Sequence, residues 1–426
     1  MKKKYLFTIL LVLSSFYNYG QCTVPDIENP TFTSCPTNLT PNVGAGTCTA
    51  SVATANPVTA DNCAVTKLTW ALTGATTGNS PATGINNLAT QAFNLGTTTV
   101  TYTASDAAGN SEVCYYTVIV SDNINPTISC PANVNTNVGA GTCTASVATA
   151  NSVTADNCSV TKLTWALTGA TTANSAATGI NNLGTQVFNL GTTTVTYTVS
   201  DAAGNTANCS YTVIVTDNIN PTFTSCPTNL TPNVGAGTCT ASVATANPVT
   251  ADNCSVTKLT WALTGATTAN SVATGINNLG TQVFNLGTTT VTYTVSDAAN
   301  NSVSCSFTVI VSDNINPTIT CPSNMTANIG AGSCTASVIT PNPTTNDNCS
   351  VTKLTWALTG ATTGNSAASG INNLGTQVFN LGTTTVTYTV SDAANNSVSC
   401  SFTVIVSDNI NPTITCPSNM TANVGA

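Results

Sequence analysis

Hydrophobic and polar residues alternate with a period of two along most of the chain. The clearest example lies between residues 142 and 215, where four runs alternate in this way. The hydrophobic positions of these runs are Cys143, Ala145 and Val147; Leu163, Trp165 and Leu167; Val195, Tyr197 and Val199; and Cys209, Tyr211, Val213 and Val215. Most residues between them are Thr or Ser. This pattern, rich in β-branched and aromatic residues, predicts β-strands.

Turn signals separate the runs. They are GAG at Gly139, ADNC at Ala155, NLG at Asn189 and SDAAGN at Ser200. The stretch from Gly169 to Gly184 has little pattern, and we expect a long connection there with one edge strand. Outside the N-terminus no helical period stands out. Roughly seven short strands in about 95 residues predict an all-β chain of immunoglobulin-like β-sandwiches.

The whole pattern repeats. Tryptophan recurs at Trp70, Trp165, Trp261 and Trp356, with spacings of 95, 96 and 95 residues. A period of this length is a whole domain, so we expect tandem domains arranged as beads on a string. The predicted division is a signal peptide at 1–20, complete repeats at 21–121, 122–216, 217–312 and 313–407, and a truncated fifth repeat at 408–426.

The N-terminus is typical of an export signal. Three lysines, Lys2 to Lys4, precede the apolar run from Tyr5 to Leu13 and a polar stretch that ends at Gly20. The apolar run is too short to span a bilayer. Gln21 stands where a lipobox has a small residue, which disfavours lipidation of Cys22 and leaves the role of this cysteine open. We expect a secreted or extracellular protein that is not membrane-spanning.

Composition narrows the chemistry. The 426 residues include 7 Lys+Arg, all of them Lys, against 15 Asp+Glu, and there is no His. Without His or Arg, the chain has neither an imidazole-assisted nucleophile nor a bidentate clamp for phosphate. A net charge of −8 disfavours binding to nucleic acid, which depends on Lys and Arg contacts to phosphates. We therefore expect no catalytic residues and no enzyme.

Cysteine recurs four times in each complete repeat. Four cysteines allow three connectivities, and the spacing alone does not decide between them. We favour first-to-fourth and second-to-third bonds, because the fourth cysteine is in phase with the inward residues of the closing strand. A Cys₄ zinc site is disfavoured, since no paired C-x₂₋₄-C knuckles exist. The predicted disulfides are Cys35-Cys114, Cys48-Cys63, Cys130-Cys209, Cys143-Cys158, Cys226-Cys305, Cys239-Cys254, Cys321-Cys400 and Cys334-Cys349.

These motifs together resemble the hyalin repeat (HYR) module. Its pattern falls here at Cys130-Pro131, Asp156-Asn157-Cys158, Phe188, Gly191, Val195, Tyr197, Asp201, Gly204-Asn205, Cys209, Tyr211 and Val213. Repeats 3 and 4 have Asn300 and Asn395 where the glycine of one turn is expected, and Asn tolerates the left-handed conformation. The resemblance covers the chain from about Val24 and implies an immunoglobulin-like fold in extracellular proteins, often adhesive ones, with no catalytic residues. We expect a bacterial source.

Three kinds of candidate site remain. The linker sequence from Ser121 to Pro126 could supply oxygen ligands to Ca²⁺, but one Asp per linker is few and an Asx turn explains it equally well. We therefore expect no cofactor. Other acids per repeat are few, as with Asp156, Asp201 and Asp217, and a glycosidase pair built from Asp26, Glu28 or Glu112 is disfavoured.

The tryptophans are the third kind of site. They could form a face that stacks on carbohydrate, but their parity matches Leu163 and Leu167, which favours core residues packed against a disulfide. The single lysine of each repeat is most simply a solvated strand position.

The sequence favours a non-catalytic extracellular structural or adhesion array that acts as a spacer or interaction scaffold. Its partner would be a protein or glycan at the cell surface or in the matrix. The alternative is a glycan-binding or accessory array of a larger secreted hydrolase. The chain stops at Ala426, early in a fifth repeat, and we expect it to be a fragment of a longer protein.

Overall fold

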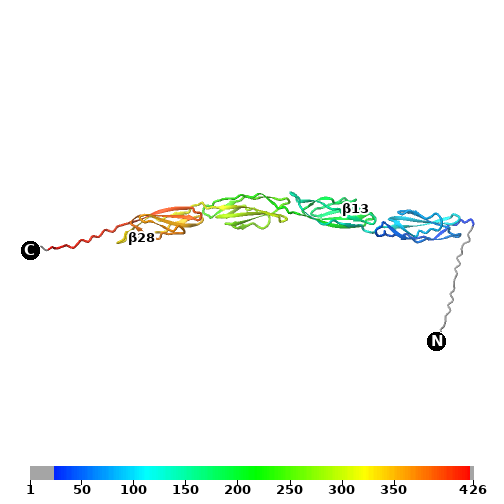
Figure 1. Ribbon diagram of the computed structural model, residues 1–426, viewed down its shortest axis with the longest axis horizontal. Helices are drawn as coiled ribbons and strands as arrows, with labels where there is room; N and C mark the ends of the chain where they lie inside the picture. The colour runs from blue at the N-terminus through cyan, green and yellow to red at the C-terminus, as the bar shows by residue number, and fades with distance from the viewer. Residues whose placement is uncertain (1–23, 423–426) are drawn as a thin grey trace, which may run out of the picture. The chain divides into compact units, whose positions relative to one another are not determined.

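The computed structural model describes residues 24–422, so the predicted signal peptide lies outside the described residues. Within them every regular element is a β-strand. The four repeats form separate sandwiches in two compact units (Figure 1). One unit holds repeats 1 and 2, and the other holds repeats 3 and 4 together with the short segment Ala140–Thr142. Each unit is described by itself.

The strands recur in the same order in each repeat. Repeat 1 contains β1 (Thr31–Ser34), β2 (Thr49–Ala53), β3 (Val58–Ala60), β4 (Lys67–Gly74), β5 (Gly78–Asn79), β6 (Thr90–Asn94), β7 (Gly96–Ser105) and β8 (Ser111–Val120). Repeat 2 contains β9 (Thr127–Ser129), β10 (Val134–Asn137), β11 (Thr144–Ala148), β12 (Val153–Ala155), β13 (Val160–Gly169), β14 (Ala173–Asn174), β15 (Thr185–Asn189), β16 (Gly191–Asp201) and β17 (Thr206–Thr216).

Repeats 3 and 4 form the second unit. Repeat 3 contains β18 (Thr222–Ser225), β19 (Thr240–Ala244), β20 (Val249–Ala251), β21 (Val256–Gly265), β22 (Ala269–Asn270), β23 (Thr281–Asn285), β24 (Gly287–Asp297) and β25 (Ser302–Val311). Repeat 4 contains β26 (Thr318–Thr320), β27 (Met325–Asn328), β28 (Thr335–Ile339), β29 (Thr344–Asn346), β30 (Val351–Gly360), β31 (Gly364–Asn365), β32 (Thr376–Asn380), β33 (Gly382–Asp392) and β34 (Ser397–Ser407).

Repeat 4 shows how the two layers are built. Its larger sheet has the order β27-β34-β33-β30-β31, in which only β27 and β34 run parallel. The pairs β28–β32 and β26–β29 lie outside this sheet. The patternless stretch of each repeat contributes one short edge strand, β31 in repeat 4 and β14 in repeat 2. The predicted all-β, immunoglobulin-like fold is confirmed.

The core of repeat 4 lies between these layers. Phe379 of β32, Val386 and Tyr388 of β33 and Val404 of β34 have no exposed surface, and Leu358 of β30 is 2% exposed. Their parity is the one that the sequence predicts, because residues two apart on a strand share a face. Each sandwich therefore buries one face of every long strand.

Hydroxyl groups satisfy backbone donors inside the sandwich, which explains part of the high threonine content. Thr384 is completely buried, and its Oγ1 accepts a hydrogen bond from the backbone N–H of Thr362 at 3.0 Å. The Oγ1 of Thr362 accepts in turn from the N–H of Asn380 at 2.8 Å. A short chain of hydroxyls thus connects the two layers through groups that are otherwise costly to bury.

The turn between β33 and β34 requires a left-handed residue. Asn395 has φ 71° there, and Asn300 has φ 70° at the same place in repeat 3. In repeats 1 and 2 this position is Gly109 and Gly204, with φ 95° and 94°. Asn replaces Gly at this turn because it is the side chain that tolerates this conformation best.

The first cysteine of each repeat is bonded to the fourth. The pairs are Cys35–Cys114, Cys130–Cys209, Cys226–Cys305 and Cys321–Cys400, each with a sequence separation of 79. In repeat 4 this bond ties the end of β26 to β34, so it joins the opening segment of the domain to its closing strand.

The second and third cysteines do not bond within a repeat. Cys48 of repeat 1 is bonded to Cys158 of repeat 2, and Cys239 of repeat 3 to Cys349 of repeat 4, each across 110 residues. The predicted pairs Cys48-Cys63, Cys143-Cys158, Cys239-Cys254 and Cys334-Cys349 are therefore wrong. Cys63, Cys143 and Cys254 are also disulfide-bonded. Cys334 and Cys416 are free and exposed.

The reason is that the second and third cysteines of one repeat lie at opposite ends of its sandwich. Cys239 precedes β19 and bonds forward to repeat 4, whereas the turn of Cys254 holds Asp252 against Asp217 at the beginning of repeat 3. The five residues of β19 alone span about 17 Å at roughly 3.3 Å per residue. A disulfide needs Cα atoms within about 7 Å, which excludes a bond across that distance.

No segment of residues 24–422 forms a helix with the length and hydropathy that a membrane crossing requires.

The core tyrosines yield a prediction with a matched control. Leu183 donates its backbone N–H to the Oη of Tyr197 at 3.0 Å, and Tyr197 is completely buried. Tyr197→Phe leaves that N–H without an acceptor and should lower the stability of repeat 2 by about 1–3 kcal/mol. Chemical denaturation, followed by hydrogen exchange of repeat 2 peptides, measures the loss.

Tyr211→Phe is the control for this change. Its hydroxyl is buried near the hydroxyl of Thr149 and makes no hydrogen bond of good geometry, and repeats 3 and 4 carry Phe307 and Phe402 at the same position. We expect its stability to equal or exceed that of the unchanged chain. Equal losses in the two variants would contradict the assigned role of the Tyr197 hydroxyl.

The disulfide between repeats can be tested by cutting the chain. A protease recognition sequence inserted between Val311 and Thr318 separates repeats 3 and 4 in the backbone. After cleavage the two pieces should run as one species without reductant and as two with it, because Cys239–Cys349 still joins them. The double variant Cys239→Ser, Cys349→Ser should separate without reductant. Separation of the unchanged cysteine pair without reductant would favour bonds within repeats.

Candidate functional site

Polar side chains gather in a cluster of turns at the beginning of each repeat, and in repeats 2, 3 and 4 also in a groove on the larger sheet. The turn cluster of repeat 4 starts with Asp347, directly after β29. One carboxylate oxygen of Asp347, Oδ2, accepts hydrogen bonds from the backbone N–H groups of Cys349 and Ser350, both at 3.0 Å. This Asx turn fixes the backbone of Cys349 and so aims its sulfur at repeat 3.

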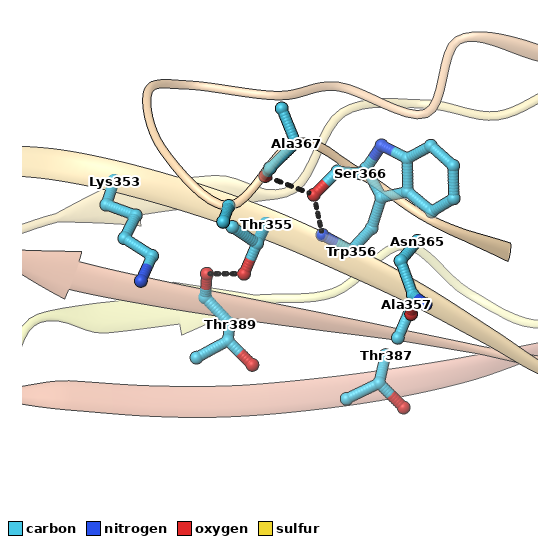
Figure 2. Close-up of a pocket in the computed structure, with 10 residues that line it drawn as sticks. Lys353, Thr355, Trp356, Ala357, Asn365, Ser366, Ala367, Thr387 and Thr389 are labelled. Atoms are coloured by element: carbon cyan, nitrogen blue, oxygen red, sulfur yellow. Dashed lines mark hydrogen bonds between the residues drawn. The ribbon is translucent and has the colours of Figure 1, made fainter.

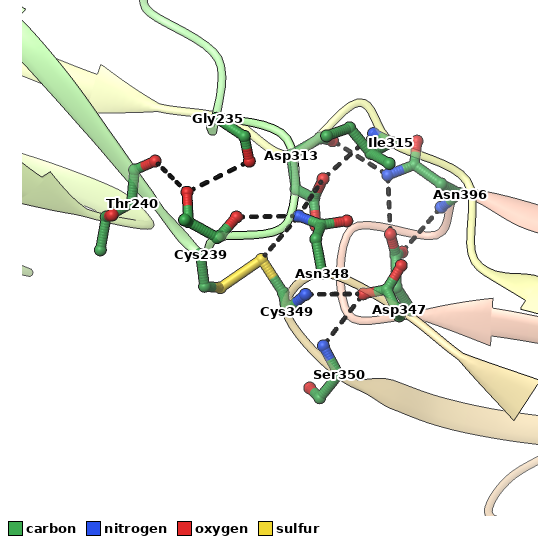
Figure 3. Close-up of a disulfide and its surroundings, with 12 residues drawn as sticks. Gly235, Cys239, Thr240, Asp313, Ile315, Asp347, Asn348, Cys349, Ser350 and Asn396 are labelled. Carbon is green, nitrogen blue, oxygen red and sulfur yellow. Dashed lines mark hydrogen bonds between the residues drawn. A yellow bond between two sulfur atoms is a disulfide. The ribbon is translucent and has the colours of Figure 1, made fainter.

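Asn348 connects this turn with repeat 3 and with the linker. Its Nδ2 donates to the carbonyl oxygen of Thr238 at 3.1 Å and lies 3.4 Å from both carboxylate oxygens of Asp313. Figure 3 shows Asn348 between the Cys239–Cys349 disulfide and Asp313. One amide side chain thus contacts the preceding repeat, the linker and its own turn.

Asp313 is the linker residue of this cluster and is 8% exposed. Its Oδ1 accepts the N–H of Ile315 at 3.0 Å, which closes a turn in the linker. Its backbone carbonyl accepts from the Nδ2 of Asn396 at 3.0 Å. The linker is therefore held by the turn that follows β33.

Asp392 ends β33 and completes the cluster with 3% exposure. Its two carboxylate oxygens accept the N–H of Asn396 at 2.8 Å and the Nδ2 of Asn396 at 2.7 Å. At the equivalent position of repeat 1, burial opposes ionisation of Asp106. Hydrogen bonds from Asn110, Gly109 and Ala108 outweigh it and lower the pKa of Asp106 below its ordinary value.

The three carboxylates come together in every repeat. A carboxylate oxygen of each lies within 4.8 Å of the others in four clusters: Asp26, Asp61 and Asp106; Asp122, Asp156 and Asp201; Asp217, Asp252 and Asp297; and Asp313, Asp347 and Asp392. We call each of these an Asp triad. Its members come from the linker, from the Asp-Asn-Cys turn and from the end of the strand before the Asp-x-x-Gly/Asn-Asn turn.

Some of these acids stand out in the sequence, but their positions along the chain do not join them. The structure brings Asp156 and Asp201 together with Asp122, and Asp217 belongs to the next triad. Asp26 lies in the first triad, whereas Glu28 and Glu112 belong to none of the clusters found in residues 24–422. The sequence contains a signal for the triads, because in each repeat the three acids are the first residues of three separate turn motifs.

The second place is an open groove of about 300 Å³ on the outer face of the larger sheet in repeat 4. Lys353, Thr355 and Ala357 of β30 line it with Thr387 and Thr389 of β33 (Figure 2). Grooves of about 280 and 260 Å³ with matching linings occur in repeats 2 and 3. Their lining consists of hydroxyls, amides and small apolar groups with one lysine and the tryptophan of the repeat, and it contains no carboxylate.

The tryptophan that contributes to this groove has the parity of the other face of the strand. Trp356 pairs with Tyr388 across the ladder, and Tyr388 is completely buried, so both point inward. Trp356 is half-buried and packs on the core, while its backbone N–H donates to the Oγ of Ser366 at 3.0 Å. The residue paired with disulfide-bonded Cys400 is Tyr388, so this tyrosine stands between the tryptophan and the disulfide.

Known relatives share this chain's repeats. Hyalin of the sea urchin Strongylocentrotus purpuratus is 28% identical over 344 residues, which cover 78% of this chain and 25% of that protein. Hyalin of Lytechinus variegatus is 27% identical over 339 residues, which cover 77% of this chain and 56% of that protein. The chain thus spans about a quarter and about half of the length of these two relatives. They are echinoderm proteins and lend no support to the predicted bacterial source.

Solved structures resemble the chain only distantly. Protocadherin Gamma B2 extracellular cadherin domains 3–6 align over 90% of this chain and all of that one, with 13% identity and a TM-score of 0.33. The immunoglobulin domains 1–5 of Sidekick-1 align over 89% of this chain and 82% of that one, with 14% identity and a TM-score of 0.29. Scores this low carry no argument about function.

The family model gives the decisive comparison. The HYR domain matches four consecutive segments, residues 25–120, 121–215, 216–311 and 312–406. These segments include the Asp-Asn-Cys turns, the Asp triads and the cysteine framework described above, and together they cover most of the sequence. The chain belongs to the HYR domain family.

Proposed function

We propose that the chain is a non-catalytic extracellular array of HYR domains that serves as a structural or adhesive scaffold. The observation that carries this proposal is the disulfide between consecutive repeats, Cys48–Cys158 in one unit and Cys239–Cys349 in the other. A bond of this kind does not cross-link two strands of the same domain. It makes the connection between two domains covalent at a second point, which is useful where the chain must transmit tension or hold a fixed spacing.

The disulfides also support an extracellular location. Fifteen cysteines among the described residues are bonded, and disulfides persist in oxidising compartments. We propose that the chain is exported by the N-terminal signal and is secreted or held at the cell surface. Its partner there would be a protein or a glycan of the surface or matrix.

The accessory glycan-binding function has less support. It requires an aromatic face open to sugar rings. Trp356 of repeat 4 lines the groove, but it is half-buried, has inward parity and packs on the core. The rest of the groove presents threonine, serine and asparagine side chains, alanine methyl groups and one lysine. Such a surface suits a scaffold that stays soluble with few charges, since only 5% of the residues are charged.

Resistance to trypsin tests the compactness that a scaffold needs. The lysines beyond the leader are Lys67, Lys162, Lys258 and Lys353, and each lies in the strand that carries the repeat's tryptophan. Cleavage requires that strand to leave its sheet. The oxidised chain should remain intact during a digestion that cuts the reduced, denatured chain into its five expected tryptic pieces, as judged by gel and mass spectrometry. Rapid cutting of the oxidised chain would contradict the proposal.

A further inference from the structure

The Asp triad of each repeat has the properties of a cation site, which goes beyond the scaffold function. In repeat 4 it unites Asp313, Asp347 and Asp392, whose carboxylate oxygens lie within 4.8 Å of one another. Asp313 and Asp392 are more than nine-tenths buried. Three carboxylates at this separation repel one another strongly when they are shielded from water.

The protein supplies no cation that offsets this charge. The chain has no Arg and no His, and within residues 24–422 no lysine forms a salt bridge with a carboxylate. Lys353 of β30 pairs with Ser391 of β33, the residue before Asp392. Its side chain is exposed and lines the outer groove. A cation from solution would offset this charge.

Two buried oxygens of the cluster lack hydrogen-bond donors. Oδ1 of Asp347 and Oδ1 of Asn348 each expose less than 1 Å² and have no partner, although the other polar atoms of both side chains are bonded. Figure 3 shows the amide oxygen of Asn348 on the side that faces Asp347, away from the disulfide. Buried acceptors normally find a hydrogen-bond donor. Two buried acceptor oxygens without a donor, one of them in the triad itself, therefore indicate a missing ligand.

The same two oxygens are unpaired in all four repeats. They are Oδ1 of Asp61, Asp156, Asp252 and Asp347, and Oδ1 of Asn62, Asn157, Asn253 and Asn348. The hydrogen bonds that hold the other oxygens recur as well, such as those from Asn205 to Asp201 and from Asn396 to Asp392. The arrangement is therefore a property of the repeat.

The ligand atoms select the class of metal. All are oxygens of carboxylates or of an amide, which suit hard cations, and zinc prefers nitrogen and sulfur ligands that this cluster does not offer. Mg²⁺ requires a near-ideal octahedron, whereas Ca²⁺ accepts six to eight oxygens in irregular geometry. Oxygens that are held in place by separate turns fit the larger ion better.

We propose that each Asp triad, together with the amide oxygen of the Asn in the Asp-Asn-Cys turn, binds one Ca²⁺ ion. In repeat 4 the ion contacts the linker through Asp313, the turn that carries Cys349 through Asp347, and the end of β33 through Asp392. Binding therefore ties the linker to the domain that follows it, next to the disulfide. The four triads predict four ions per chain within residues 24–422.

Equilibrium dialysis of the oxidised full chain against Ca²⁺ counts these sites. We expect about four ions per chain with dissociation constants on the order of 10⁻⁴–10⁻³ M, the range of extracellular calcium modules. Mg²⁺ in equal concentration should displace little of the bound Ca²⁺. A chain that binds no Ca²⁺ at about ten times the upper value of this range, or that binds Mg²⁺ equally well, overturns the proposal.

Asp347→Asn removes one charge at the triad of repeat 4 and should reduce the count from four ions to three. Asp408→Asn is the matched control, because Asp408 makes the same linker turn with the N–H of Ile410 but belongs to none of the triads. It should keep four ions. Equal counts for the two variants would overturn the assignment.

A stability measurement separates loss of the ion from loss of the fold. In chelator, Asp347→Asn should unfold at the same temperature as the unchanged chain or higher, since it relieves repulsion. In saturating Ca²⁺, repeat 4 of the variant should show a smaller rise in unfolding temperature than the unchanged repeat. A variant that is less stable by the same amount in chelator and in Ca²⁺ would show that Asp347 only supports the turn, and would contradict the proposed site.

Discussion

The Asp-Asn-Cys turn at the beginning of each repeat is the constraint on which the rest of the structure depends. Its Asp holds the turn through two backbone N–H groups, as Asp347 does for Cys349 and Ser350. Its Asn reaches the carbonyl of Thr238 in the preceding repeat, and its Cys bonds to Cys239 there. Three consecutive residues therefore perform the local folding of the turn, the recognition of the neighbouring domain and the covalent connection to it.

The energetics of the domain and of the connection are of different kinds. Inside a repeat, stability comes from a core of Val, Leu, Phe and Tyr and from threonine hydroxyls that satisfy buried backbone groups. The disulfides act chiefly on the unfolded chain, where closing a loop of about 100 residues is worth about 4.7 kcal/mol on the loop-entropy model. The bonds that close 110 residues restrict two domains at once, so they couple the unfolding of neighbours.

The few charged residues of the chain are unevenly distributed. Each repeat has few acids, and three of them meet in one buried cluster at the point where the linker enters the domain. Elsewhere the groove on the larger sheet presents threonine, serine, asparagine, alanine and tryptophan, with a single lysine. The charge that the protein retains is thus concentrated at the connections between domains, where it can bind an ion, and the remaining surface is polar and nearly neutral.

The fold class, the repeat and the buried face of each strand can be predicted from the sequence alone. These features are local, since alternation along a strand decides which residues point inward, and the parity of Trp165 and Tyr197 could be read from their neighbours. The sequence also led to the bond between Cys130 and Cys209, because the fourth cysteine is in phase with inward Tyr211.

Only the tertiary structure decided the partner of the second cysteine and the meeting of the three acids. Cys48 and Cys63 are close in the sequence, but the strands between them carry them to opposite ends of the sandwich, and the cysteine within reach is Cys158 of the next repeat. Asp313, Asp347 and Asp392 are distant in the sequence and meet because three turns end at the same edge of the fold. Closeness in the sequence therefore led to a wrong disulfide, because strands carry sequence neighbours apart. Distance in the sequence left the Asp triad unpredicted, because the sandwich brings turns from distant segments together.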